Sequence, residues 1–331
     1  MAESVDKERD ARMTLAALSE PSDIITGTLV ARLGASETVQ LISSAARLPN
    51  GVDPTEGDLW RRRLAPRINP GQIDRIRVDM ERHRLRLLTP EDIDWPGELQ
   101  QLGAGAPIAL WLKGDASRLS APLAGRVTIV GARAATAYGT QVATELASDL
   151  ASQGRVILSG GAYGIDGSVH RAATLSFPGS TVAVLAGGLD RLHPAGHEQL
   201  FERIEQSDGL LVSELPPGST PTRWRFLQRN RILAALSGAT VVVEAGHRSG
   251  SLIVAGQAHS LGRPVGAVPG PVTSPASAGC HRLIQEGVAS LVSDTQDVTD
   301  LLDSTAGFSG DRTFSYSPTR RFDRTGPDLR L

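Results

Sequence analysis

Short apolar runs alternate with amphipathic stretches from residue 126 to about residue 300. The runs are rich in Val, Ile and Leu, whereas the stretches between them repeat apolar residues at helical spacing. The predicted strands are 127–130, 155–158, 181–185, 210–213, 240–244, 264–268 and 289–291, and the predicted helices are 138–153, 166–175, 197–206 and 251–261. Apolar strands separated by helices pair in parallel and are covered on both faces. The pattern therefore predicts an α/β fold with an extended Rossmann-like, doubly wound, mostly parallel sheet.

The N-terminal part shows helical periodicity only. Large apolar residues recur three or four positions apart between residues 13 and 46, Asp23 is an N-cap candidate and Gly34 marks a stop. A further helix is predicted over 70–82, and a short strand within 108–115. The predicted organisation is a disordered segment 1–10, a small all-helical (SAM-like) domain 11–88, an extended Rossmann-like domain 89–303 and a disordered tail 304–331, which is rich in Ser, Thr, Gly and Arg.

The composition restricts which ligands the chain can bind and in which cellular compartment it is expected. The 331 residues carry a formal net charge of −2, so an anion-binding surface has to come from local clusters of arginine. Cys280 is the only cysteine, which excludes an intramolecular disulfide framework and a Cys-x-x-Cys zinc site. No apolar run approaches the ~20 residues of a membrane span, and the first residues are polar, unlike a signal peptide. We therefore expect a soluble, cytoplasmic protein with no membrane span.

Small residues are concentrated directly after the predicted strands. Glycine-containing loops follow five of them, at 131–139, 159–166, 187–190, 246–251 and 269–271. Ligands of open α/β sheets bind beyond the carboxyl ends of the strands. A glycine lets backbone N–H groups approach a ligand oxygen at the start of a helix. Five such loops on one edge favour a phosphate site over ordinary tight turns. These loops contain neither G-x-x-x-x-G-K-[ST] nor G-x-G-x-x-G, so hydrolysis of a nucleoside triphosphate is not expected.

Arginines and aromatic residues alternate between residues 223 and 231. The stretch contains Arg223, Arg225, Arg229 and Arg231, with Trp224 and Phe226 between them. Guanidinium groups can follow a nucleic-acid backbone while rings stack on exposed bases, which suits a single strand. The same stretch fits the start of an amphipathic helix that packs inward, and both interpretations can hold. Two further arginine clusters, at 61–67 and 75–86, suit either a solvated helix face or secondary contacts to phosphates.

Six segments resemble the DNA-processing protein A (DprA/Smf) family in their order and spacing. They are SGGAYGIDGSVHRAA, TVAVLAGGLDRLHPAGHEQL, GLLVSELPPG, FLQRNRILAALS, VVVEAGHRSGSLIVAGQA and RPVGAVPG. The resemblance covers about residues 107–302, with a weaker match among the N-terminal helices. It implies an extended Rossmann-like fold that binds single-stranded DNA in a basic pocket, independently of sequence. It also implies a homodimer that loads the RecA recombinase during natural transformation and homologous recombination.

The resemblance also implies which residues contact DNA. The family pattern G-[ST]-R-x-x-[ST]-x-Y-G is matched at 131–139, with Arg133 as its phosphate-binding arginine. The pattern F-x-x-R-N-R is matched at 226–231, and Arg223 falls where a basic residue of the family contacts DNA. The expected DNA-binding residues are Gly131, Arg133, Thr136, Tyr138, Gly139, Ser159, Gly160, Gly161, Tyr163, Gly164, Arg223, Phe226, Arg229, Asn230, Arg231, Ser249, Gly250 and Ser251.

Four positions depart from the family pattern. Ala132 stands in place of a hydroxyl residue, which removes one phosphate donor. Tyr163 stands where Lys is common, which exchanges a charge for a stacking surface. His193 replaces Tyr, and Cys280-His281 replaces the usual Ser/Thr-Asn. These departures bear on DNA affinity rather than on the fold.

Two alternatives to a DNA-binding protein remain open. The first is a Rossmann-like enzyme of the nucleotide phosphoribohydrolase type, in which Asp166 and Glu244 would serve as acid and base. The P-G-G-x-G-T-x-x-E pattern of those enzymes does not occur in the sequence. We expect Asp166 instead to cap the helix that begins there, and Glu244 to hold neighbouring loop amides. The second alternative is a scaffold that binds only proteins.

Asp190, His193 and His197 have D-x-x-H-x-x-x-H spacing, which makes them candidate metal ligands. Pro194 and Gly196 lie between the histidines, so the three side chains do not share one helical face. We therefore expect no metal, no cofactor and no catalytic residues.

Overall fold

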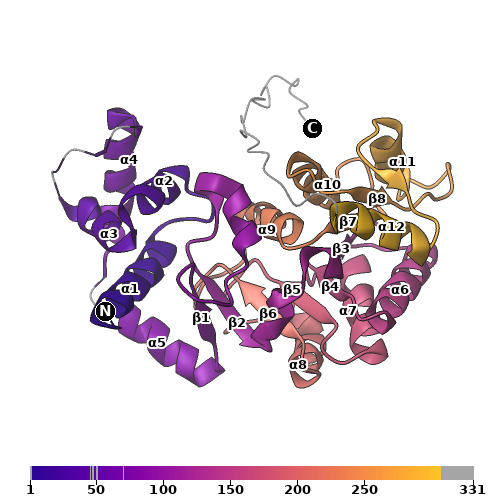
Figure 1. The fold of residues 1–331 in the computed structure, drawn as a ribbon, viewed down its shortest axis with the longest axis horizontal. Coiled ribbons are helices and arrows are strands. Elements are labelled where there is room, and N and C mark those ends of the chain that lie inside the picture. Colours follow the sequence, from indigo (N-terminus) through magenta and orange to yellow (C-terminus); the bar gives the residue numbers. More distant parts are fainter. Residues whose placement is uncertain (1, 45, 47, 50, 70, 307–331) are drawn as a thin grey trace, which may run out of the picture.

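A sheet of nine strands runs through the centre of the molecule (Figure 1). The structure is a computed structural model that describes residues 2–306 except 45, 47, 50 and 70. The strand order is β1-β2-β6-β5-β4-β3-β7-β8-β9, and all pairs are parallel except β1–β2 and β2–β6. The strands are β1 (Arg86–Leu88), β2 (Leu110–Gly114), β3 (Arg126–Val130), β4 (Val156–Ser159), β5 (Thr181–Val184), β6 (Leu210–Ser213), β7 (Ala239–Val242), β8 (Val265–Ala267) and β9 (Ser290–Leu291). The predicted α/β fold with a mostly parallel sheet is confirmed.

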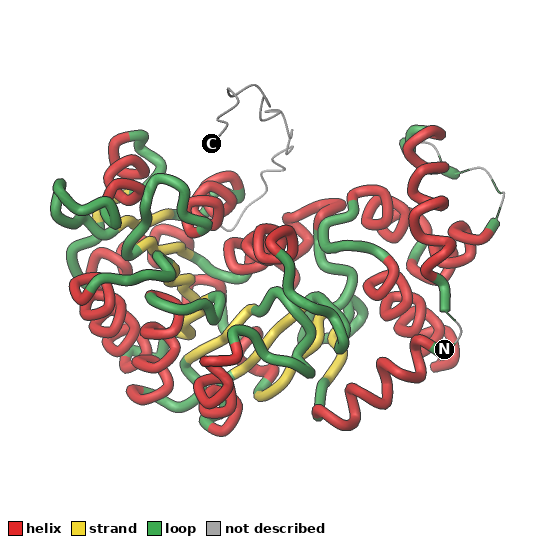
Figure 2. The backbone as a smooth tube through the Cα atoms, turned by 180° about the vertical axis from the view of Figure 1, so that it is seen from behind, coloured by secondary structure: helices red, strands yellow, loops and turns green. Residues whose placement is uncertain are grey.

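Helices cover both faces of this sheet (Figure 2). One face carries α9 (Arg223–Ala235), α10 (Ser251–Ser260) and α11 (Ala278–Gln285). The other carries α6 (Ala137–Ser152), α7 (Ile165–Ser176), α8 (Glu198–Gln206) and α12 (Thr295–Ala306). Short 3₁₀ helices lie in the connections: η1 (Ala65–Arg67), η2 (Gly97–Gly105), η3 (Ala116–Ser120), η4 (Leu123–Gly125) and η5 (Ala195–His197).

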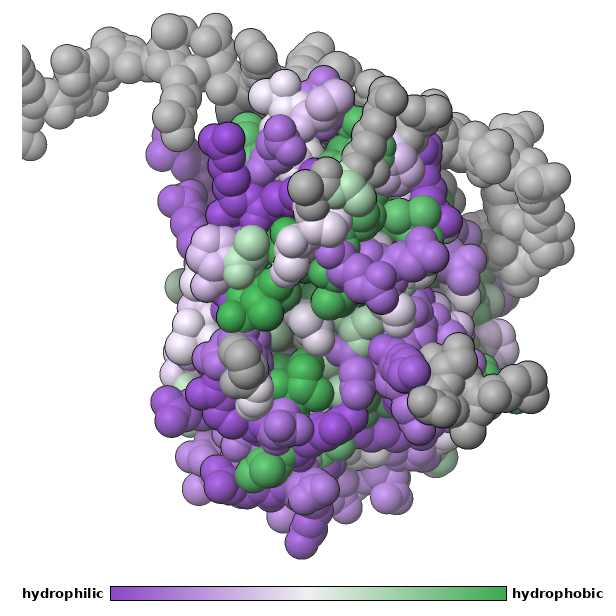
Figure 3. Space-filling model, turned by 90° about the vertical axis from the view of Figure 1, so that its left-hand side faces the viewer, coloured by the Kyte–Doolittle hydropathy of each residue, from purple (hydrophilic) through white to green (hydrophobic). Residues whose placement is uncertain are grey.

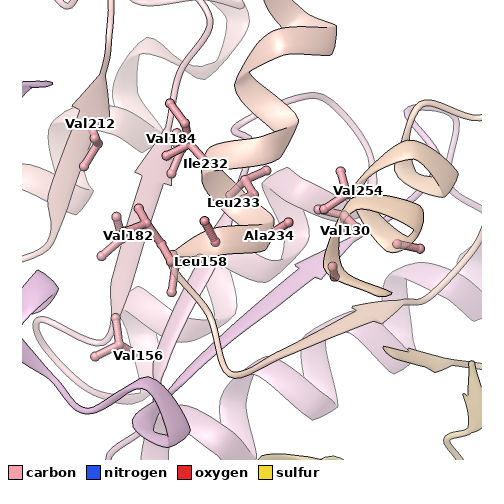
Figure 4. Packing of buried hydrophobic residues seen from close by; sticks show 14 of the residues in the cluster. Val130, Val156, Leu158, Val182, Val184, Val212, Ile232, Leu233, Ala234 and Val254 are labelled. Carbon is pink, nitrogen blue, oxygen red and sulfur yellow. The ribbon is translucent and has the colours of Figure 1, made fainter. Parts of the chain in front are cut away.

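The alternation of side chains along the strands explains why the strands are apolar throughout. In β4, Ile157 packs with α6 and α7, whereas Val156 and Leu158 pack on the opposite face. On that face, Ile232 and Leu233 of α9 meet the valines of β5 and β6 (Figure 4). Because helices cover both faces of the sheet, the side chains on either face are buried, and the strands show no alternation of apolar and polar residues.

The N-terminal helices have a core of their own. They are α1 (Ala2–Leu18), α2 (Ile24–Leu33), α3 (Ala35–Ser43) and α4 (Pro54–Leu64). Their fully buried side chains include Leu15, Leu18, Leu29, Trp60 and Leu64. The indole Nε1 of Trp60 donates to Thr26 Oγ1 at 2.8 Å, which satisfies the one polar atom of that ring. The helical N-terminal part is therefore confirmed.

Two predicted boundaries differ from the structure. Residues 2–10 belong to α1 rather than to a disordered segment, and the charged side chains of Glu8 and Arg9 have distant partners. Glu8 accepts hydrogen bonds from the backbone N–H groups of Ala35 and Ser36, and Arg9 binds Asp92 at 2.8 Å. The boundary after residue 88 is also displaced, since β1 pairs with β2 inside the sheet. The helix α5 (Gln72–His83) packs under that sheet through Ile76.

The expected tail begins later than residue 304. Helix α12 continues to Ala306 because Val298 and Leu302 are fully buried against the sheet. The rest of the expected tail, residues 307–331, lies outside the described residues. Among the helices of the described ranges, none is both long enough and apolar enough to cross a lipid bilayer.

Candidate nucleic-acid interface

The glycine-containing loops meet at one edge of the sheet. Strands β5, β4, β3, β7 and β8 are consecutive and parallel, so the loops that follow them share the carboxyl edge. A Cβ at Gly131 would lie 2.5 Å from Cγ1 of Ile165, and one at Gly164 would lie 2.3 Å from the carbonyl oxygen of Ala132. Gly164 also has φ = 75°, which disfavours other residues. At these two positions glycine is required by the approach of one loop to the next.

Glu244 fixes the first of these loops. The side chain is 2% exposed, and its carboxylate accepts hydrogen bonds from the N–H of Thr136 at 2.9 Å and from the Thr136 hydroxyl at 2.5 Å. The same hydroxyl accepts from the N–H of Gly139 at the start of α6. This confirms that Glu244 holds loop amides, and it leaves the carboxylate engaged rather than free to act as an acid or base.

The buried carboxylate of Asp166 connects the loop after β3 with the loop after β4. The expected helix cap is wrong, because Gly164 occupies the N-cap position of α7. The Asp166 carboxylate instead accepts from the N–H of Ala162 in the loop before the helix. Burial raises the pKa of Asp166, while Arg229 and the backbone amides of Ala162, Gly131 and Gly160 act in the lowering direction. Asp166 thus joins the loops that follow β3 and β4.

Arg229 is the buried cation beside Asp166. Its guanidinium donates to the carbonyl oxygen of Gly160 at 2.8 Å and also to that of Val184. Burial lowers the pKa of Arg229 to about 10, Asp166 opposes that shift, and the like charge of Arg133 adds to it. The guanidinium stays protonated near neutral pH, so a positive charge lies under the loops after β4 and β5.

Arg133 lies above this buried pair and is held by an aromatic ring. Its Cζ is 4.9 Å from the ring centroid of Phe226, and the Cζ of Arg229 is 5.9 Å from the same centroid. The ring of His193 packs edge-on against Phe226, with 5.9 Å between centroids. Phe226 is therefore already in contact with three side chains, while Arg133 is exposed to solvent. The geometry favours Phe226 as a support for Arg133 over Phe226 as an open stacking surface.

Three other aromatic side chains offer exposed rings. Tyr163 is 49% exposed and packs by its edge against His197, whose Nδ1 lies 3.0 Å from the carbonyl oxygen of Gly161. Tyr138 is 41% exposed and donates its hydroxyl to the carbonyl oxygen of Pro269. Trp224 is 54% exposed at the first turn of α9. The rings of Tyr163 and Tyr138 are each held by one contact, and all three rings are exposed enough to meet a base.

Two further expected DNA contacts, like Arg229, have partners inside the protein instead. Arg231 is 5% exposed and forms two hydrogen bonds with the carboxylate of Glu214, at 2.6 and 2.5 Å, and one with the carbonyl oxygen of Gly105 at 2.7 Å. The buried side chain of Asn230 points its Nδ2 at the carbonyl oxygen of Gly250, 3.4 Å away. Both residues belong to the half of α9 that packs on the sheet, so they support the site rather than face solvent.

The remaining expected residues divide into a buried and an exposed set. Gly139, Ser159, Gly160 and Gly161 are buried below the edge, and the Ser159 hydroxyl donates to a carbonyl oxygen of β3. The exposed or partly exposed residues are Gly131, Arg133, Thr136, Tyr138, Tyr163, Gly164, Arg223, Phe226, Ser249 and Gly250. Ser251 is buried, with its hydroxyl 2.7 Å from that of Ser249.

Two further polar side chains of the glycine loops were not predicted to belong to the site. His247 and Arg248 are exposed on the loop between β7 and α10. The loop itself was predicted from its glycines, but its two basic side chains were not singled out. Arg248 adds a positive charge to this loop.

Most arginines of the N-terminal clusters have partners within the protein. Asp or Glu side chains or backbone carbonyl oxygens bind Arg61, Arg63, Arg67, Arg77, Arg82 and Arg86. This pairing favours a solvated helix face over a second phosphate surface.

The histidines considered for chemistry are engaged locally. His170 lies 2.8 Å from the Thr181 hydroxyl, and burial lowers its pKa to about 3. Asp190 accepts from the N–H of Gly218, and His197 faces a carbonyl oxygen. In the part of the chain that the structure describes, no three His, Cys, Asp or Glu side chains are grouped to hold a metal ion.

Comparison with known proteins identifies relatives of the whole sheet domain. A putative DNA processing protein DprA of Mycobacterium tuberculosis is 49% identical over 253 residues, which is 72% of this chain and 64% of that protein. The DNA processing protein DprA of Streptococcus pneumoniae is 39% identical over 227 residues, 69% of this chain and 78% of the relative. The chain thus spans somewhat less than two thirds of its mycobacterial relative.

Two solved structures share the fold. The X-ray structure of DNA processing protein A from Streptococcus pneumoniae aligns with a TM-score of 0.68 at 30% identity, over 87% of this chain and 95% of that one. DNA processing protein A from Helicobacter pylori, which was described for its unique mode of binding single-stranded DNA, aligns with a TM-score of 0.59 at 30% identity, over 67% and 98%. The sequence profile described as DNA recombination-mediator protein A matches residues 86–303, and the chain therefore belongs to that family.

Proposed function

We propose that this protein binds single-stranded DNA at the carboxyl edge of its sheet, without regard to sequence, and acts in recombination without catalysing a reaction. Phosphates of the strand contact Arg133 and the loop amides, and unstacked bases lie against Tyr163 and the neighbouring exposed rings. The relative from Helicobacter pylori, described as binding single-stranded DNA, supports this proposal through its shared fold.

The observation that carries the proposal is the support of Arg133. An exposed guanidinium is held over Phe226, which in turn lies over the buried pair of Arg229 and Asp166. Long arginine side chains lose conformational entropy when they bind a phosphate, and a held guanidinium has less to lose. Glycine loops around it bring backbone N–H groups to the same edge.

The engagement of the two candidate acids supports a binding protein over an enzyme. Glu244 is bound to Thr136, and Asp166 is bound to loop amides next to Arg229. Neither carboxylate has a solvent-facing position from which to exchange protons with a substrate.

The test is a titration of labelled oligonucleotides with the Arg133→Ala variant at two salt concentrations. Arg133→Ala should weaken binding and should flatten the slope of log K against log salt by about 0.7, the value for one phosphate contact to a single strand. Arg203→Ala is the matched control, because Arg203 is exposed at the end of α8, on the opposite edge of the sheet. Equal affinity and slope in a folded Arg133→Ala protein would refute the assignment.

Three further parts of the proposal rest on the family resemblance. They are loading of the RecA recombinase onto the bound strand, a homodimeric state, and a cytoplasmic location in which both partners are present. The assignment of the N-terminal helices to a SAM-like domain is likewise a proposal. Stimulation of RecA filament formation on a coated single strand, and sedimentation equilibrium of the free protein, test the first two.

A further inference from the structure

An apolar groove lies between the N-terminal helices and the first turn of α9. Its cavity of about 530 Å³ is lined by the loop before α2, by α4 and by Trp224. Three large apolar side chains of this lining are more than half exposed: Ile24 (56%), Leu59 (59%) and Trp224 (54%). Viewed from the side of the N-terminal helices, the molecule shows hydrophobic side chains gathered among hydrophilic ones (Figure 3). Single exposed apolar residues are ordinary, but three from separate segments around one cavity indicate a binding surface.

The first turn of α9 connects this groove to the edge with Arg133. Phe226 contacts Arg133, whereas Trp224 lines the groove. Between them, Arg225 forms two hydrogen bonds of 2.9 Å with the carboxylate of Glu20, and these hold α9 against the loop between α1 and α2. Residues 224 and 226 are about 3 Å apart along the helix axis. The two positions also differ by about 200° around the helix axis, so a strand that contacts both Arg133 and Trp224 has to pass around the first turn of α9, where Arg223 is exposed.

The charged residues around the groove determine whether it favours the phosphates or the bases of a DNA strand. Glu20, Asp23 and Glu56 line it, against one cation, Arg63, which is bound to Asp23. Glu20 is paired with Arg225 and Asp23 with Arg63, so the lining carries one further carboxylate, Glu56, which disfavours phosphates. Carboxylates accept hydrogen bonds from the amino groups of bases, as they do from cytosine N4. Apolar walls and an exposed indole suit the faces of the bases themselves.

We propose that the groove between α2, α4 and Trp224 binds unstacked bases of the same single strand that is bound at Arg133, with Trp224 as the stacking surface. The phosphates of this part of the strand stay outside, on the side of Arg223. The inference rests on the proposed function and extends the DNA site beyond the sheet edge. It predicts that long strands gain affinity from the groove and that short strands do not.

Tryptophan fluorescence reports occupation of the groove directly. The chain has four tryptophans, of which Trp60 and Trp111 are fully buried and Trp224 is more than half exposed. Addition of an oligodeoxycytidine of about thirty bases should quench part of the emission, because a stacked base lies on the indole. The quenching should disappear in Trp224→Phe, which keeps a stacking ring and most of the affinity. Quenching of equal size in Trp224→Phe, or none in the native protein, would overturn the proposal.

Affinity measurements separate this inference from the proposed function. Trp224→Ala should lose about 5- to 150-fold in affinity for the strand of about thirty bases, which corresponds to stacking of one base. Its affinity for a strand of about six bases should not change, since that length is occupied by the sheet edge. Leu59→Ala, on the other wall, should show the same length dependence. Phe177→Ala is the matched control, because Phe177 is 49% exposed at the C-terminal end of α7, away from both sites.

The outcomes distinguish the two claims. If Arg133→Ala weakens both strands while Trp224→Ala weakens neither, the DNA site stands and the groove does not bind DNA. If Trp224→Ala leaves DNA binding intact but changes the sedimentation of the free protein, the groove is a contact between copies of the chain and the inference is wrong. If Arg133→Ala weakens neither strand, the proposed function itself fails.

Discussion

Replacement of Arg231 by alanine should destabilise the protein without removing its DNA site. The side chain is 5% exposed and shares two hydrogen bonds with Glu214, which is itself only 9% exposed. Truncation leaves that carboxylate buried without its cation and also frees the carbonyl oxygen of Gly105. Breaking a buried ion pair in this way costs about 3–5 kcal/mol. With an m-value of about 3 kcal/mol/M, the urea midpoint should fall by about 1–1.7 M.

The assay is urea unfolding followed by circular dichroism, together with oligonucleotide binding in the absence of urea. The double variant Arg231→Met/Glu214→Leu is the control, since an apolar pair of similar size avoids the unpaired charge and should recover most of the stability. Binding by folded Arg231→Ala should stay within about twofold of the native protein, a difference of roughly 0.4 kcal/mol. An unchanged midpoint combined with a large loss of DNA affinity would refute the reasoning and would make Arg231 a DNA contact.

Three further predictions address the site and the core. Phe226→Ala should weaken DNA binding, because Arg133 loses the ring that supports it. Adding Phe226→Ala to Arg133→Ala should then reduce the affinity little further. If the two losses of binding free energy are additive in this double-mutant cycle, Phe226 contacts DNA itself. Tyr163→Ala should reduce the preference for single over double strands by about tenfold, as loss of one stacking contact implies, and an unchanged preference would identify the wrong ring. The buried imidazole of His170 stays neutral in the folded state, because its pKa is about 3 there, against 6.5 for the free side chain. Between these two pH values only the unfolded state binds the extra proton. The free energy of unfolding should therefore fall as the pH drops from about 6.5 toward 3. This loss, about 1.4 kcal/mol per pH unit, should shrink in His170→Asn, and an equal pH dependence in that variant would assign the effect to other groups.

The sheet was predictable because its signal is local. Runs such as 127–130 and 210–213 are apolar throughout, and the observed strands β3 and β6 begin and end within one residue of them. The glycine loops were predictable for the same reason, since each follows its strand directly. The strand β1 was missed because it has three residues and is defined by its pairing with β2.

The division of the arginines into buried and exposed could not be derived from their spacing. Arg223, Arg229 and Arg231 lie on one helix and look alike in the sequence. Whether each faces solvent depends on where distant groups arrive, such as Glu214 beside Arg231 and the Gly160 carbonyl beside Arg229. The helical character of residues 2–10 has the same origin, because Glu8 finds its partners 27 and 28 positions further along the chain.

The most direct test of the central claim is a structure of the protein bound to a short single-stranded oligonucleotide. The account predicts a phosphate oxygen within hydrogen-bond distance of the Arg133 guanidinium, at the edge formed by the loops after β3 and β4, with Asp166 and Arg229 unchanged beneath it. A strand that lies along α4 or α5, with Arg133 left free in solvent, would contradict it.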